Sequence, residues 1–144
     1  MKLKLHTPGI REMEHRRRWL AQPETMAYNR GQLLDAEGYD CRTGCIDFPP
    51  ADWRWWREVW LWREPSRYSA YLMDEETGDF VGEVCYYYDM ETDAHGTGVL
   101  VEHSRRGTEI FFQMVDFQQF SHGLPPLRRP MRKRSRPPSD SAGI

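Results

Sequence analysis

The stretch GVLVEHSRRG, residues 98–107, places two arginines and a glycine just after a short apolar run. A diphosphate is bound by several N–H donors that converge on it without a side chain in the way. A turn that contains glycine supplies such donors, and arginine side chains add positive charge. Arg105, Arg106 and Gly107 therefore make this turn a candidate anion site, and the apolar run reads as the strand that precedes it.

Four titratable groups on or beside the predicted strands could accept a proton, and they are Glu83, Asp89, Glu102 and His103. Glu83 lies within FVGEVCYYYD, residues 80–89, and Glu102 directly follows the apolar run. An amine is normally protonated and only the free amine attacks a thioester, so a carboxylate could remove that proton directly or through water. Strand alternation places Glu83 and Cys85 on the same face. For each carboxylate taken alone, a solvated charge on a strand is the simpler interpretation.

The cysteines do not indicate a metal site. Cys41 and Cys45 lack the second pair of cysteine or histidine residues that zinc sites have at ligand spacing. The chain has three cysteines, an odd number without the look of a disulfide framework, which fits a reducing compartment. We therefore expect no metal.

The composition changes abruptly near residue 123. Residues 124–144 hold five Arg and one Lys against one Asp, net +5, whereas residues 1–123 hold 14 basic and 21 acidic residues, net −7. The sequence predicts one domain over residues 1–123 and a disordered basic tail over residues 124–144. The cluster RRPMRKRS in the tail could bind nucleic acid, but no aromatic residues interleave, and nucleic acid is not the expected partner.

No apolar run in the sequence approaches the ~20 residues that span a membrane. The N-terminus MKLKLHTPGIREM also lacks the apolar stretch of a signal peptide. These features favour a cytoplasmic protein without a membrane partner.

Three strands must position the carboxylates and the arginine turn. Residues 67–73, 80–89 and 97–102 are β-rich runs joined by short turns, which predicts an antiparallel meander with residues 80–89 at its centre. Residues 2–6 read as a further strand. The meander would place Glu83 on its middle strand and the arginine turn at its end.

Two helices are predicted between the first strand and the meander. Residues 10–21 form the first, and its HRRR run, residues 15–18, is expected mostly to face solvent. The second opens at Pro50 and ends at Glu64, just before a proline. Three of its tryptophans share one helical face and are expected to pack in the core: Trp53, Trp56 and Trp60.

In this order the elements resemble the GNAT superfamily of N-acetyltransferases over residues 1–112. The resemblance is carried by TGDFVGEV, residues 77–84, a hairpin turn that leads into a strand, and by GVLVEHSRRG, which sits where the acetyl-CoA signature of the family begins. It implies an α/β (α+β) fold, in which a mixed sheet with an antiparallel meander at about residues 67–102 is flanked by helices.

The resemblance also implies a cofactor, a reaction and site residues. Acetyl-CoA would be the co-substrate, the acceptor would be a primary amine of a small molecule or peptide, and Glu83 and Glu102 would be the catalytic carboxylates. The residues implied in acetyl-CoA binding are Val99, Leu100, Val101, Arg105, Arg106 and Gly107.

The second half of the acetyl-CoA signature departs from the family pattern Q/R-x-x-G-x-G/A. Ser104 stands at the Q/R position, Gly107 at the first glycine and Glu109 at the small residue, so Gly107 alone matches. Glu109 would place a carboxylate beside an anion, which is unfavourable. Only 37 residues follow Gly107, whereas the remaining elements of the family fold need about 50.

We therefore expect a truncated acetyltransferase-like fold without its C-terminal half. A shifted reading frame and a divergent end are both compatible with residues 124–144. The alternative function is a non-catalytic remnant, or an interaction module that uses the tryptophan-rich helix of residues 50–63.

Overall fold

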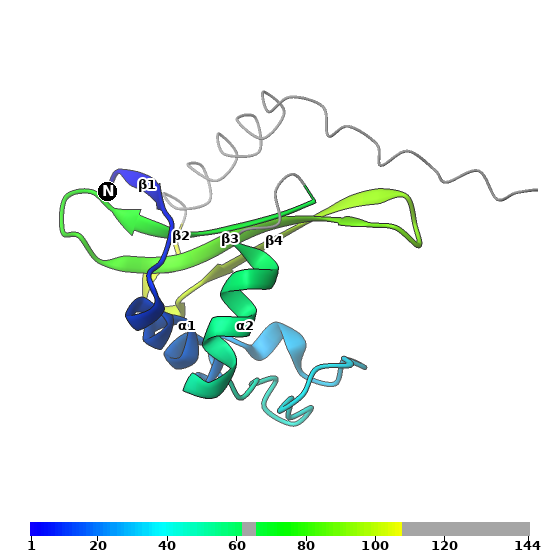
Figure 1. The fold of residues 1–144 in the computed structure, drawn as a ribbon. Coiled ribbons are helices and arrows are strands. Elements are labelled where there is room, and N and C mark those ends of the chain that lie inside the picture. Colours follow the sequence, from blue (N-terminus) through cyan, green and yellow to red (C-terminus); the bar gives the residue numbers. More distant parts are fainter. Residues whose placement is uncertain (62–65, 108–144) are drawn as a thin grey trace, which may run out of the picture.

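The computed structural model describes residues 1–61 and 66–107. It contains one four-stranded sheet, with α1 and α2 on one face (Figure 1). The strands pair in chain order and are antiparallel throughout. They are β1 (Leu3–His6), β2 (Arg67–Asp74), β3 (Phe80–Asp89) and β4 (Ala94–Val101).

The predicted meander is confirmed, with β3 between β2 and β4. β4 begins at Ala94, three residues before the predicted start, because the β3–β4 connection is tight and Asp89 already pairs with Ala94. The positive φ of 51° at Asp93 reverses the chain within this turn. The α+β class is confirmed for the described residues, while the mixed sheet and its missing half stay predictions.

The first predicted helix is divided into two parts. Residues Ile10–Glu12 form a 3-10 turn, η1, and α1 (Met13–Leu20) follows it directly. Glu12 fixes this start because its Oε2 accepts hydrogen bonds from the Gly9 amide and from His6 Nε2, both at 2.7 Å. The entry into α1 is thereby tied to the end of β1.

The second helix, α2 (Pro50–Trp60), carries the expected aromatic face. Trp56 is buried, Trp53 and Trp60 pack against the core beside it, and Trp55 is 62% exposed. The shared face of the three predicted tryptophans is therefore confirmed. Leu61 caps the helix, and the rest of the predicted stretch to Glu64 lies outside the described residues.

The main core lies between the helices and the sheet. Trp19 of α1 packs edge-on against Tyr71 of β2, with ring centroids 5.0 Å apart. A second apolar cluster holds Ala70 and Leu72 of β2 with two valines of β3. The main cluster includes Met13, Trp19, Leu20, Met26, Phe48, Trp56, Leu61, Tyr71 and Leu100.

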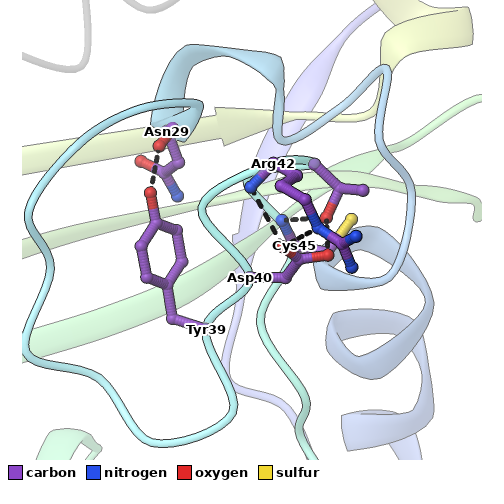
Figure 2. Close-up of polar contacts among 6 residues, drawn as sticks. Asn29, Tyr39, Asp40, Arg42 and Cys45 are labelled. Carbon is purple, nitrogen blue, oxygen red and sulfur yellow. Dashed lines mark hydrogen bonds and ion pairs between the residues drawn. The ribbon is translucent and has the colours of Figure 1, made fainter.

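The loop between the two helices is held by its own hydrogen bonds (Figure 2). The Asp40 carboxylate accepts from the Arg42 amide at 2.9 Å, and the Tyr39 hydroxyl donates to the carbonyl of Asn29 in the 3-10 turn η2 (Ala27–Asn29). Gly44 has a φ of 80°, and a Cβ there would lie 2.2 Å from a backbone oxygen beside η2. The loop thus packs closely against η2 and is hydrogen-bonded to it.

No helix of residues 1–61 and 66–107 is long and apolar enough to cross a membrane. The predicted domain boundary near residue 123, the basic tail and Glu109 all lie outside the described residues.

Candidate functional site

The outer edge of β4 is the first part of the candidate site, and it pairs with no strand of the described residues. Leu100 O points toward β3, because a Cβ on Gly82 would lie 2.1 Å from it. Val101 O instead accepts a hydrogen bond from Arg106 Nε at 3.1 Å. Since neighbouring residues of a strand alternate, the backbone groups of Val99 also face the outer edge.

The side chains of the predicted binding strand point to two different faces. Leu100 is 6% exposed and belongs to the core beneath the helices. Val99 lies opposite Val84, on the sheet face away from α1 and α2, and is 40% exposed. Only the backbone of β4 is therefore positioned to pair with an extended ligand at this edge.

In the turn after β4, two backbone amides that the sequence predicts as diphosphate ligands already donate hydrogen bonds within the turn. The turn forms a short 3-10 helix, η3 (His103–Arg105). The Arg105 amide donates to Glu102 O at 2.9 Å, and the Arg106 amide donates to His103 O at 3.2 Å. A diphosphate at this turn would have to compete with these bonds.

The two arginines of the turn have different surroundings. The Arg106 guanidinium donates to three carbonyl oxygens, including Thr25 O at 2.6 Å, and so clamps the end of β4 to the segment before η2. Arg105 forms a partly exposed ion pair with Asp79 at 2.8 Å. Such a pair contributes little, so Arg105 is the arginine that can turn toward an anion at low cost.

Glu83 is the centre of the second part of the site, on the face of β3 beneath the helices. Its Oε1 forms an ion pair with Arg16 Nη1 of α1, and the two side chains are 13% and 16% exposed. The Arg16 guanidinium lies 4.3 Å from the ring centroid of Trp56 and 5.2 Å from that of Phe48. The pair therefore joins α1, α2 and β3.

The prediction that the HRRR run mostly faces solvent is wrong for Arg16. Met13, Arg16 and Leu20 follow the i, i+3, i+7 spacing of one helical face, and Met13 and Leu20 are buried. This spacing indicates that Arg16 lies on the buried side of the helix together with Met13 and Leu20. Arg17, one position on, remains on the exposed side and pairs with Glu14.

The Glu83 carboxylate also contributes to the pKa shifts of two other groups. Burial, with the Glu83 carboxylate second, raises the pKa of the Cys85 thiol and of the Tyr28 hydroxyl. The second carboxylate oxygen, Oε2, is closed to solvent and has no hydrogen-bond partner among the described residues. An unsatisfied buried acceptor typically costs about 1–3 kcal/mol.

The other predicted carboxylate, Glu102, lies at the end of β4 and meets different partners. Its Oε1 accepts a hydrogen bond from Gln22 Nε2 at 3.2 Å. Burial and Arg18 lower the pKa of the nearby His15, and Glu102 is one of the carboxylates that oppose this shift. The structure thus separates the two predicted carboxylates, with Glu83 beside Arg16 of α1 and Glu102 beside Gln22, just beyond the end of α1.

Cys85 is expected to react with iodoacetamide at pH 8 at least about tenfold more slowly than Cys41, since the thiolate is the nucleophile. Cys41 is exposed, whereas burial raises the pKa of Cys85. Timed alkylation followed by peptide mass spectrometry measures both rates, and denatured protein is the control in which they converge. Equal rates in the folded protein would contradict the placement of Cys85 beneath the helices.

Within residues 1–61 and 66–107, no group of three His, Cys, Asp or Glu side chains could hold a metal ion. No protein-family model, curated protein or solved structure matches the chain.

Proposed function

We propose that this chain is an N-acetyltransferase-like protein that binds acetyl-CoA along the outer edge of β4, in the arrangement that transfer of the acetyl group to a primary amine requires, but that it is inactive because the diphosphate half of its cofactor site is incomplete. The observation that carries the proposal is the edge itself. The described elements are a strand, two helices on one face of the sheet and an antiparallel meander. The last strand of the meander, β4, has outer backbone groups that face no other described strand. The GNAT resemblance implies this order of elements.

The chemistry of the edge fits the pantetheine arm of acetyl-CoA. That arm carries amides, and an extended chain with amides can add to an open sheet edge by backbone hydrogen bonds. Val99 would supply an N–H donor and a carbonyl acceptor. The thioester would then lie beside β4, where amine attack on its carbonyl carbon forms the C–N bond, breaks the C–S bond and releases coenzyme A as the thiol.

The proton lost by the amine needs a base, and both predicted carboxylates are on the helix side of the sheet. Glu83 is held by Arg16, and Glu102 is held by Gln22. Either one could take the proton through water. The small-molecule or peptide acceptor would approach from this side.

The diphosphate half of the site is weaker than the edge. Two turn amides and the Arg106 guanidinium already have protein partners. Ser104 and Glu109 depart from the family signature. We therefore expect affinity to come from the pantetheine arm, and we expect no turnover.

Acetyl-CoA and acetyl-pantetheine, which lacks the diphosphate, are expected to bind with similar millimolar dissociation constants, about 4 kcal/mol of binding free energy. NMR titration of the full chain measures both, and a thiol-release assay with amines measures turnover. Val99→Pro removes the outward N–H and should abolish binding, whereas Val99→Ala keeps it and serves as the control.

If neither acetyl-CoA nor acetyl-pantetheine binds, the proposed function is wrong. Micromolar binding of acetyl-CoA alone would show that the turn does hold the diphosphate. Turnover would show that the residues after Gly107 complete the site.

One observation favours the second candidate, an interaction module on α2. Trp55 is 62% exposed, although Trp56 is buried and Trp53 and Trp60 pack against the core. The exposed aromatic surface of the helix is thus mainly a single ring. We therefore favour the open edge of β4, with its outward backbone groups, over this single exposed ring as the candidate binding site.

A further inference from the structure

The sheet face away from α1 and α2, called the far face below, is buried at its centre although no described helix lies on it (Figure 1). Ala70, Val81 and Val84 are 0% exposed, and Leu72 is 3% exposed. Side chains of one sheet face pack side by side and leave their outer ends open, so burial of this degree requires a second layer. That layer is not among residues 1–61 and 66–107.

The far face is apolar and continuous across three strands. Leu5 of β1 lies opposite Leu72, and Val84 of β3 lies opposite Ala70. Val81 joins this face because the register shifts between Leu72 and Met73. Partly buried residues pack around the buried four, and they are Leu3, Leu5 and Tyr68. The second layer must therefore present an apolar surface of its own.

The described chain ends beside the far face. The Glu102 amide donates to Val81 O at 2.9 Å, and Arg105 pairs with Asp79, the residue before β3. Gly107 follows two residues later. The chain therefore continues from a point close to the first residues of β3, where the far face is fully buried.

The sequence that continues from this point is apolar. Residues 108–120, TEIFFQMVDFQQF, hold four of the six phenylalanines of the chain, and Ile110, Met114 and Phe117 follow the i, i+4, i+7 spacing of one helical side. A helix of this length extends about 20 Å, enough to cross four strands that lie about 4.8 Å apart. Residues 124–144, with a net charge of +5, offer no such apolar side.

We propose that residues 108–120 of this chain dock on the far face as its second layer. The side that carries Ile110, Met114 and Phe117 would contact the valines of β3. The inference goes beyond the proposed function, because it gives the residues after the arginine turn a place in the fold that is separate from the acetyl-CoA edge. A segment docked in this way covers a face of the sheet and adds no strand to β4.

The test is a nuclear Overhauser experiment on the full chain, with labelled leucine and valine methyl groups and protonated phenylalanine rings in a deuterated background. Both described phenylalanines, Phe48 and Phe80, pack on the helix side of the sheet. Contacts from the methyl groups of Leu72 and Val84 to phenylalanine rings are expected, and only phenylalanines after Gly107 can supply them.

Two outcomes would overturn the proposal. In the first, the methyl groups of Leu72 and Val84 show no contact to a phenylalanine ring. In the second, a mixture of methyl-labelled chains and chains with protonated phenylalanine shows the same contacts between different molecules, which would assign the cover to a second copy.

Variants of the full chain test the orientation of the segment. Met114→Asp should abolish the contacts and lower the thermal midpoint by at least about 5 °C, because a carboxylate would be buried against the valines. Gln119→Asp adds the same charge on the opposite side of the helical projection and is the matched control, with contacts kept and a midpoint within about 2 °C. Equal effects of the two substitutions would contradict the proposed side. The experiment on the unaltered chain is decisive even if Met114→Asp does not fold.

Discussion

Arg16→Met is expected to lower the free energy of unfolding by about 3–5 kcal/mol, the usual cost of removing one partner from a buried ion pair. The substitution leaves the Glu83 carboxylate without its cation in a site where its side chain is 13% exposed. It also removes the guanidinium from the rings of Phe48 and Trp56. Urea denaturation followed by tryptophan fluorescence measures the loss.

A double variant separates the charge from the packing. Arg16→Met combined with Glu83→Leu removes both charges and should recover most of the stability, since apolar residues often replace a buried pair without cost. Arg17→Met is the control on the same helix. Its partner Glu14 is 41% exposed, so its effect should stay within about 0.5 kcal/mol. A similar loss for Arg16→Met and Arg17→Met would show that the Arg16 pair is not buried in solution.

This ion pair also bears on the reaction. A carboxylate that holds α1 against β3 is fixed in place by its ion pair with Arg16. Such a group is less free to move toward a substrate. Glu102 lies at the end of β4, where its carboxylate accepts a hydrogen bond from Gln22 Nε2 at 3.2 Å instead of pairing with a buried arginine.

Local patterns predicted most of the described fold. The meander follows from β-rich runs between short turns, and both helices follow from apolar spacing and from Pro50. The charged HRRR run predicts one solvated face, whereas the spacing from Met13 to Leu20 places Arg16 inward, as the structure shows. At this position the spacing of the buried residues predicts the orientation of the side chain better than the run of charges does.

The candidate site depended more on contacts between distant residues. The sequence predicted Arg106 as an anion ligand, yet it donates to Thr25 O, from a segment 81 residues earlier. The Arg16–Glu83 pair spans 67 residues. No local pattern specifies such partners, because they depend on how η2 and α1 pack against the sheet.

Gly82→Ala is expected to lower the free energy of unfolding by more than about 2 kcal/mol, since overpacking against a backbone atom cannot be relieved by a side-chain rotation. A Cβ at this position would lie 2.1 Å from Leu100 O and 3.0 Å from the Cα of Val101. β3 and β4 must therefore separate at the end of β4 that carries the proposed acetyl-CoA edge. Thermal and urea denaturation measure the loss.

The same substitution connects stability to the proposed edge. If the shift of β4 displaces Val99, folded Gly82→Ala should also lose binding of acetyl-pantetheine in the NMR titration. Gly9→Ala is the matched control, because a Cβ there makes an ordinary contact at 3.6 Å. It should change stability by less than about 0.5 kcal/mol and leave binding intact. Unchanged stability in Gly82→Ala would contradict the close approach of β4 to Gly82, and with it the outward direction of the Val99 backbone.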